Sequence, residues 1–324
     1  MSDTLQVRVP AFAKINLGLK VLDRRADGFH ELRTVFQTVS LADTLEIAFT
    51  PARATKIAIT CNVEIPGRNL VERAALVALE AMRAKGRIEI HLDKRIPMGG
   101  GLGGGSSDAA AVLLALPVLA HKRLALTGLI DLAAGLGSDV PFFLLGGRAV
   151  ALGRGTELYP LPDLGAAYGL LIAPGIHVST PAAYRALNRP QAEAGRPELT
   201  SAAAQNIISS FQSIVWDEGD SSAVSPGVAG GNDFESVVFL EHPRLKSLKL
   251  ELERLGARPA MLSGSGSALY GIFRTQAAAA CARGAFPNEK VYPISLVSRA
   301  RYRALWRRRL GTLTAGKGWP PQSR

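Results

Sequence analysis

The first sixty residues alternate between hydrophobic and polar positions, a pattern typical of β-strands. The pattern predicts strands over residues 7–22, 34–41, 43–49 and 56–63. The Asp27-Gly28 pair between the first two runs is typical of a tight turn, so we expect them to form a hairpin.

Helical periodicity begins at residue 69. Asn69 is a good N-cap, Glu72 stands at the capping-box position, and Gly86 is placed to end this helix. A strand over 87–92 leads into a glycine-rich loop, and Ser106 or Ser107 then caps a second helix, which Pro117 closes. A further apolar helical stretch covers 124–136, so the pattern predicts a mixed α/β unit.

Prolines and glycine at residues 159–165 suggest a boundary. Beyond it we expect a strand from 168, a helix with Pro181 in its first turn, a helix over 242–256, two strands joined by Gly264-Ser265-Gly266, and a helix over 277–284. Residues 188–205 and 217–231 are polar and typical of loops. We therefore predict an N-terminal domain over 1–162, an α+β C-terminal domain over 163–300, and a tail over 301–324.

The charge of +11 changes this picture little, because it is concentrated near the C-terminus. From Ser298 onward there are eight basic residues and no acidic ones, which leaves +3 for the rest of the chain. We expect this basic tail to be poorly ordered and to contact neither nucleic acid nor membrane. A basic RNA-binding protein remains the alternative, and its affinity for RNA would fall steeply with salt.

Other features point to a cytoplasmic location. The two cysteines form no disulfide framework, the N-terminus lacks a secretory pattern, and the longest apolar run, 109–120, is too short to span a bilayer.

The candidate chemistry starts at PMGGGLGGGSSDAA, residues 97–110. A flexible linker would not stand between a strand and an apolar helix. A dinucleotide fingerprint would need an acidic residue at the end of a second strand about 20 residues on, where this chain is helical. A phosphate cradle fits best, because backbone N–H groups of glycines and of a helix N-terminus bind anions. The absence of GK[ST] excludes a Walker-type P-loop.

This stretch resembles the ATP-binding signature of the GHMP kinases, P-x-x-x-G-L-G-S/G-S-S-x-A-A, with one glycine more before the serine pair. AFAKINLGL with RADGFHEL, GLGSDVPFFLLG and GSGSALYGIF resemble other parts of the family, in its order. The resemblance implies an α+β fold with a ribosomal-protein-S5-domain-2-like N-terminal domain and a ferredoxin-like C-terminal domain. It also implies ATP with Mg²⁺ and, as acceptor, the 2-hydroxyl of a cytidine diphosphate-linked methylerythritol in non-mevalonate isoprenoid biosynthesis. We expect a monomer or weak homodimer.

The resemblance also assigns residues. For ATP it implies Pro97, Met98, Gly99, Gly100, Gly101, Leu102, Gly103, Gly104, Gly105, Ser106 and Ser107. For catalysis it implies Lys14 and Asp139, and for the acceptor it implies Asn16, Phe29, His30, Thr180, Tyr184, Gly264, Ser265 and Gly266. No clean set of metal ligands stands out, although Ser107 is the best single candidate. Many relatives carry Tyr where this chain has Phe29; stacking survives that change, but a phenolic hydrogen bond does not.

Each of these residues also has a structural interpretation. Asp139 could stand in a turn before a proline, and Lys14 could be a strand residue whose ammonium reaches the solvent. RADGFH could be a plain hairpin turn, and Tyr184 could be an aromatic residue of the core. The alternatives in function are another GHMP kinase of homoserine or mevalonate type, or an NAD-binding oxidoreductase inferred from the glycines alone.

Overall fold

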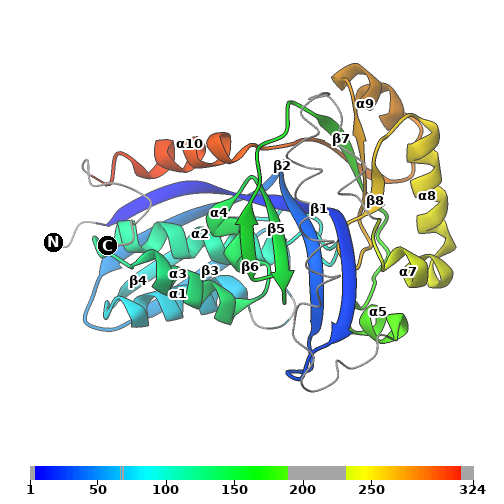
Figure 1. Ribbon diagram of the computed structural model, residues 1–324. Coiled ribbons are helices and arrows are strands. Elements are labelled where there is room, and N and C mark those ends of the chain that lie inside the picture. The colour runs from blue at the N-terminus through cyan, green and yellow to red at the C-terminus, as the bar shows by residue number, and fades with distance from the viewer. Residues whose placement is uncertain (1–3, 66, 68, 189–230, 315–324) are drawn as a thin grey trace.

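The computed structural model describes residues 4–65, 67, 69–188 and 231–314, which form two sheets with helices packed on them (Figure 1). The first sheet has the order β3-β4-β2-β5-β6, with β1 paired to β2. Its strands are β1 (Leu5–Arg24), β2 (His30–Pro51), β3 (Lys56–Cys61), β4 (Gly86–Asp93), β5 (Arg148–Gly153) and β6 (Glu157–Pro160). The second sheet, β10-β7-β9-β8, contains β7 (Tyr168–Ala173), β8 (Ala260–Leu262), β9 (Leu269–Phe273) and β10 (Lys290–Ser295).

The long β1–β2 hairpin connects the two halves. One end of β2 pairs with β4 and the other with β5, while β1 follows β2 along nearly its whole length. The hairpin turn lies beside α5 (Thr180–Leu187), next to the second sheet (Figure 1). Leu19 and Val21 near this end of β1 pack into the core of the second half, so the hairpin brings first-sheet residues to the junction between the sheets.

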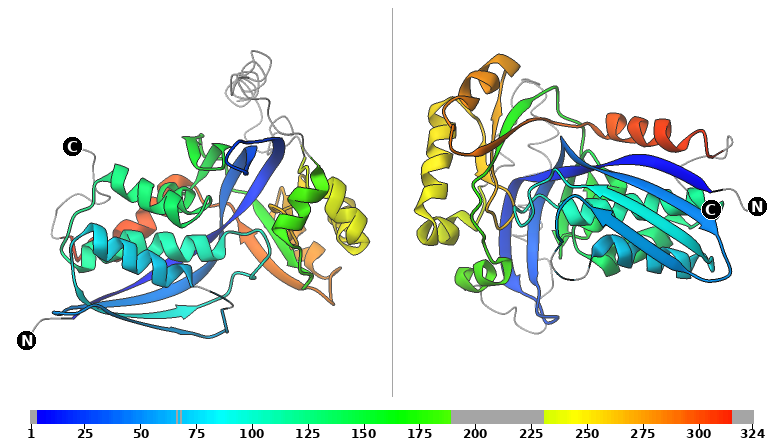
Figure 2. Two further views of the ribbon diagram at one scale, coloured as in Figure 1. Left: turned by 90° about the horizontal axis from the view of Figure 1, so that it is seen from below. Right: turned by 180° about the vertical axis from the view of Figure 1, so that it is seen from behind.

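Helices cover one side of the first sheet. These are α1 (Leu70–Ala81), α2 (Gly104–Leu119), α3 (Leu126–Leu136) and α4 (Val140–Leu145), and they share one core with that sheet (Figure 2). The second sheet packs against α7 (Glu235–Glu241), α8 (Pro243–Arg254) and α9 (Gln276–Arg283). The predicted elements are found in the predicted order, except that the strands expected over 34–41 and 43–49 form one continuous strand, β2. The sequence pattern did not predict α4, β5, β6, α7 or β10.

Three helix boundaries differ from the sequence expectation. Helix α2 begins at Gly104 with Gly103 as N-cap, not Ser106 or Ser107, and it continues through Pro117. Proline has a helical φ and removes only one hydrogen bond, so two more residues can follow it. Helix α1 has the expected Asn69 cap, whose side chain accepts from the Val71 N–H, but it ends at Ala81. Gly86 begins β4 instead, where the Phe49 ring leaves no room for a Cβ.

The expectation of a poorly ordered tail was wrong for residues 301–310. Helix α10 (Arg299–Leu310) returns from the second sheet and lies alongside β1 (Figure 1). Ser298 caps it, and Tyr302, Trp306 and Leu310 are buried in the first core. Spaced four residues apart, these three apolar side chains form one helical face, and their burial outweighs the repulsion among the arginines. Residues 315–324 lie outside the described part, as do the predicted loops over 189–205 and 217–230.

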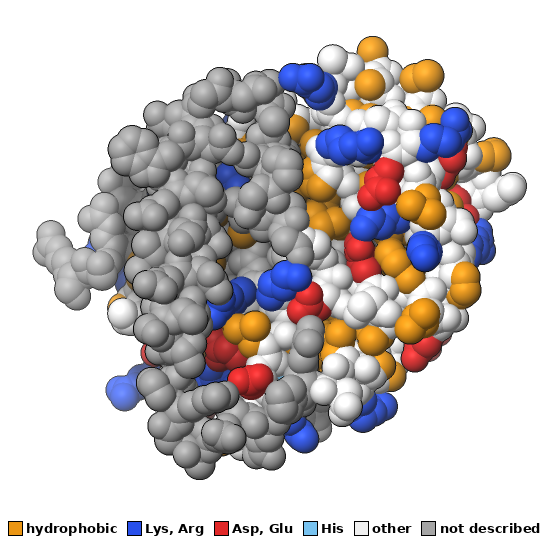
Figure 3. All heavy atoms as spheres, turned by 45° about the vertical axis from the view of Figure 1, so that its right-hand side comes forward, with side chains coloured by type: hydrophobic (Ala, Val, Ile, Leu, Met, Phe, Trp, Pro, Cys, Tyr) orange, Lys and Arg blue, Asp and Glu red, His pale blue; other side chains and the backbone are white. Residues whose placement is uncertain are grey.

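The outer face of the second half carries hydrophobic, basic and acidic side chains intermixed over its described atoms (Figure 3). On the described part of this face there is no continuous basic stripe of the kind that tracks a nucleic-acid backbone. Among the described helices, none is long and apolar enough to cross a membrane.

Candidate active site

Two cavities meet at the glycine loop that precedes α2. One, of about 230 Å³, is enclosed by this loop and by residues before α1, and Pro97 through Gly105 line it together with Lys94 and Asp108. The other, of about 820 Å³, lies between the β1–β2 hairpin, α5 and the β8–β9 loop. Gly101 lines both cavities, so a molecule in one would lie beside a molecule in the other.

The backbone geometry around the smaller cavity favours the binding of an anion. Gly99, Gly101 and Gly103 have φ of +70°, +73° and +69°, in the left-handed region that favours glycine. The loop ends at the N-terminus of α2, where no side chain caps the first N–H groups. Free N–H groups and the positive end of the helix dipole both favour a phosphate there.

Packing across the molecule holds the glycine loop in place. The Lys14 N–H donates to the Leu102 carbonyl at 3.0 Å, and the Ala268 N–H donates to the Gly100 carbonyl at 3.3 Å. The Ser263 hydroxyl donates to the Gly101 carbonyl at 3.1 Å. The loop is thus fixed between β1 and the β8–β9 loop.

Three buried ionisable side chains lie beneath the loop. Lys94 pairs with Asp43 and, at 2.8 Å, with Asp108, and all three side chains are almost inaccessible to solvent. The Asp43 carboxylate also accepts from the backbone N–H groups of Arg95 and Ile96. This network joins the chain entering the glycine loop to the helix leaving it. Burial raises the pKa of Asp108 to about 7, although Lys94 opposes the shift.

Lys14 and Asp139 lie together in the larger cavity. The Lys14 ammonium is 3.5 Å from an Asp139 carboxylate oxygen and donates to the Asn16 side chain at 2.8 Å. Asn16 in turn donates to Thr34 at 2.7 Å. Lys14 is 3% exposed, whereas the Asp139 side chain at the start of α4 is 33% exposed and opens into the cavity.

Aromatic side chains lie at the far end of the larger cavity. His30 stacks on Tyr184 of α5 with ring centroids 4.9 Å apart, and Phe29 is 48% exposed. Burial, with a smaller effect from the Asp139 charge, raises the pKa of the Tyr184 hydroxyl to about 12, so Tyr184 stays neutral at physiological pH. Thr180 and Ser265 share a hydrogen bond of 2.7 Å, which links α5 to the β8–β9 loop.

The structure brings most of the predicted site residues together. Of the residues expected to contact the acceptor, all except Gly266 line the larger cavity; Gly266 packs behind it against Leu262. Ser106 and Ser107 do not line the smaller cavity: they lie within α2, and Ser107 is buried.

Sequence reasoning missed two residues here. The Arg154 guanidinium lies over the Phe29 ring at 3.8 Å, and its buried Nε has no hydrogen-bond partner among the described residues. The buried Asn232 side chain donates to the carbonyls of Leu262 and Gly264, which supports the β8–β9 loop. Both residues stand next to glycines in segments that otherwise look like plain loops, so no periodic pattern could reveal them.

The described residues include no group of three or more His, Cys, Asp or Glu side chains that could hold a metal ion. Mg²⁺ in nucleotide sites is bound through substrate phosphates and one or two carboxylates, not in an all-protein cage. In the smaller cavity Asp108 is the one carboxylate among the described lining residues, and its buried Oδ1 has no hydrogen-bond partner among them.

Comparison with known proteins agrees with this geometry. The family model described as the GHMP kinases N terminal domain matches residues 69–147, and the model described as GHMP kinases C terminal matches residues 217–291. The 4-diphosphocytidyl-2-C-methyl-D-erythritol kinase of Solibacter usitatus is 57% identical over 324 residues, covering 100% of this chain and 99% of the relative. The enzyme of the same name from Acaryochloris marina is 40% identical over 80% of this chain and 84% of its own.

Solved structures share the fold. A crystal structure of 4-(cytidine 5'-diphospho)-2C-methyl-D-erythritol kinase has a TM-score of 0.69 at 37% identity, covering 89% of this chain and 98% of that one. Homoserine kinase from Cytophaga hutchinsonii has a TM-score of 0.65 at 19% identity, covering 90% and 97%, and this likeness concerns the fold alone.

Proposed function

Because this chain belongs to the GHMP kinase family, we propose that it transfers the γ-phosphoryl group of ATP to the 2-hydroxyl of 4-diphosphocytidyl-2-C-methyl-D-erythritol. The substrate assignment follows the relatives, which carry this activity in their names and match 100% and 80% of the chain. The observation that carries the mechanism is the Lys14–Asp139 pair at the meeting point of the two cavities.

ATP occupies the smaller cavity. Its phosphates lie on the backbone N–H groups of the glycine loop and of the first turn of α2. Lys94, which also lines this cavity, is held beneath the loop by its contacts with Asp43 and Asp108. When bound to the phosphates, Mg²⁺ would neutralise part of their charge.

The acceptor occupies the larger cavity. Phe29, which is 48% exposed, offers a ring face to the cytosine, and His30, stacked on Tyr184, offers a ring nitrogen to its edge. Arg154, together with Arg24 and Arg185 in the same cavity, provides cations that suit a diphosphate. An exposed aromatic ring and three arginines favour a nucleotide-linked acceptor over a small amino acid or a hydroxy acid.

Catalysis then needs one proton acceptor and one cation from the protein. Asp139 accepts the proton of the attacking hydroxyl, and Lys14, which is paired with it, stabilises the charge on the transferring phosphoryl group. Asn16 and Thr34 orient the Lys14 ammonium through their hydrogen bonds. Phosphoryl transfer depends mainly on positioning and electrostatics, so these groups suffice.

The test is ADP release with Mg-ATP and the diphosphocytidyl substrate, compared with its non-cytidylated analogue. We expect turnover with the first substrate only. Asp139→Asn should lower kcat by a factor of about 10² to 10⁴ while leaving ATP binding intact. The control is Asp131→Asn, an exposed aspartate of α3 outside both cavities. Near-native turnover of Asp139→Asn would refute the general-base role.

A further inference from the structure

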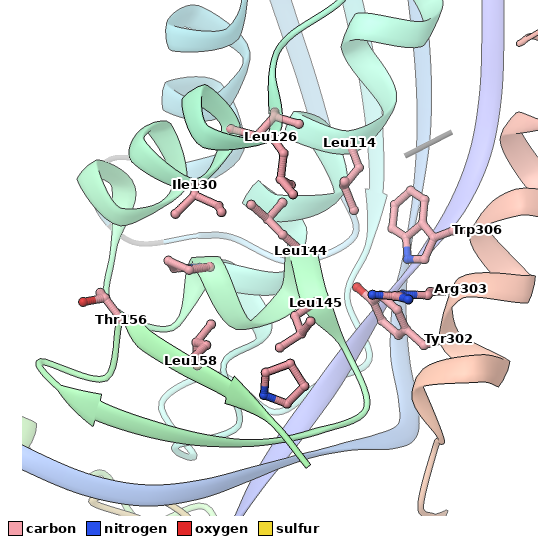
Figure 4. A pocket seen from close by; sticks show the side chains of 13 residues that line it. Leu114, Leu126, Ile130, Leu144, Leu145, Thr156, Leu158, Tyr302, Arg303 and Trp306 are labelled. Carbon is pink, nitrogen blue, oxygen red and sulfur yellow. The ribbon is translucent and has the colours of Figure 1, made fainter. Parts of the chain in front are cut away.

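A third cavity, of about 330 Å³, lies in the first half of the molecule and shares no lining residue with either kinase cavity (Figure 4). Its walls come from α2, α3, α4, β6 and α10, and Leu114, Leu144, Leu158 and Trp306 point into it. An apolar cavity of about 150 Å³ already accepts benzene, and small-molecule sites begin at about 300 Å³. The space is therefore large enough for a small organic ligand.

The mouth of this cavity is apolar and carries one cation. Leu126 and Ile130 on α3 are 37% and 42% exposed, so no described residue covers their side chains fully. Arg303 of α10 is the one charged residue among those that line the cavity. No carboxylate in the described part of the chain pairs with it, and α10 contains no acidic residue.

Helix α10 forms a fixed wall. The Tyr302 hydroxyl donates to the Phe143 carbonyl at the end of α4. A Cβ at Gly146 would lie 2.3 Å from the Tyr302 ring, and one at Gly147 would lie 2.6 Å from Arg299, so α10 packs directly on the backbone after α4. The cavity is consequently a preformed space, and a ligand need not displace α10 to enter.

We propose that this cavity binds an amphiphilic anion: a single aliphatic chain between α3, α4 and α10, with a phosphate or carboxylate head on Arg303. The apolar walls favour binding of the aliphatic chain. The Arg303 guanidinium, which has no carboxylate partner in the described part of the chain, and the other basic residues of α10 favour an anionic head. A free amphiphile fits better than a membrane surface, because five elements surround the space while a bilayer needs a flat face. The proposal does not depend on the kinase assignment.

The probe is a series of hexyl, octyl and decyl phosphate, kept below their micellar concentrations and titrated into the full-length protein by calorimetry. We expect one site, with affinity rising roughly tenfold for each two methylenes until the cavity is full. Inorganic phosphate should show no binding, and 1-octanol should bind at least about tenfold more weakly than octyl phosphate.

Two matched pairs of variants locate the site. Ile130→Glu places a carboxylate at the mouth and should weaken octyl phosphate binding more than about tenfold, whereas Leu250→Glu, an exposed leucine of α8, should not. Arg303→Gln should abolish the preference for octyl phosphate over octanol, whereas Arg301→Gln, exposed on the same helix outside the cavity, should keep it. Thermal unfolding and kinase activity confirm that each variant is folded.

Three results would overturn the proposal: no saturable binding of the alkyl phosphates, equal binding by Ile130→Glu and the parent protein, or no dependence on chain length. A fourth would assign the site to a membrane. In that case the protein would sediment with phosphatidylglycerol vesicles, Ile130→Glu would release it, and free octyl phosphate would not bind.

Discussion

Replacing Gly101 with alanine tests the idea that the glycine loop is held by close packing as well as by its ligand. A Cβ at this position would lie 2.1 Å from the Ser263 carbonyl oxygen and 2.9 Å from its carbon. Both atoms belong to the backbone, so no flexible side chain can move aside. The φ of +73° adds strain, because alanine is disfavoured in the left-handed region.

The magnitude follows from these two terms. Left-handed backbone costs alanine about 1–2 kcal/mol, and overpacking costs about 1–3 kcal/mol. Together they predict a loss of about 2–5 kcal/mol in the free energy of unfolding, which lowers Tm by roughly 3–7 °C for a protein of this size. The glycine loop must also shift away from Ser263, so the KM for ATP should rise at least about tenfold.

The assays are thermal unfolding and steady-state kinetics with ATP varied. Gly105→Ala is the matched control: it directly follows the loop, its φ is not in the left-handed region, and the nearest atom to its Cβ would be 3.7 Å away on Leu70. Because Gly105 is in the first turn of α2, alanine there should leave stability unchanged or raise it by up to about 1 kcal/mol. A Gly101→Ala protein with the parent Tm and the parent KM for ATP would refute the packing argument.

Three further predictions concern other contacts. Phe29→Ala and Arg154→Leu should each raise the KM for the cytidine-linked acceptor at least about tenfold and leave the KM for ATP unchanged. Each variant removes one partner of the cation–π contact between Arg154 and Phe29 in the acceptor cavity. An unchanged acceptor KM would exclude a role of these residues in acceptor binding. The pKa of Asp108 is about 7 in the folded protein, against an ordinary value of 3.8, so the folded protein binds this proton more tightly than the unfolded chain does. The contribution of Asp108 to the free energy of unfolding is therefore fully present below pH 4 and is lost as the pH rises through 7. Asp108→Asn should therefore show a flatter dependence of Tm on pH between 5 and 8 than the parent, and equal slopes would contradict the assignment. Tyr302→Phe should cost about 1 kcal/mol in denaturant unfolding through its lost hydrogen bond, whereas Tyr159→Phe at a 48% exposed position should cost nothing; equal effects would show that α10 is not anchored there.

Local chemistry was enough to predict most of the elements. Alternating residues predicted β1 to β4 of the first sheet but not β5 or β6. Asn69 capped α1 through its own side chain, and the Asp27-Gly28 pair formed the turn between β1 and β2. These features depend on residues a few positions apart, so a single sequence contains all the information they need. The glycine run likewise predicted a phosphate-binding loop before a helix, because bare backbone at a helix N-terminus has few other uses.

The tertiary structure determined which residues that are distant in the sequence contact each other. The sequence analysis paired Lys14 with Asp139 through family resemblance alone; the long hairpin and α4 place them 3.5 Å apart across 125 positions of chain. The contact of Arg154 with Phe29 had no local signal at all. The basic residues after Ser298 suggested a loose tail, yet α10 is ordered because Tyr302 and Trp306 find a hydrophobic core made by distant elements. Local patterns specify which surfaces a segment can bury, and only the packed fold supplies the partner that buries them.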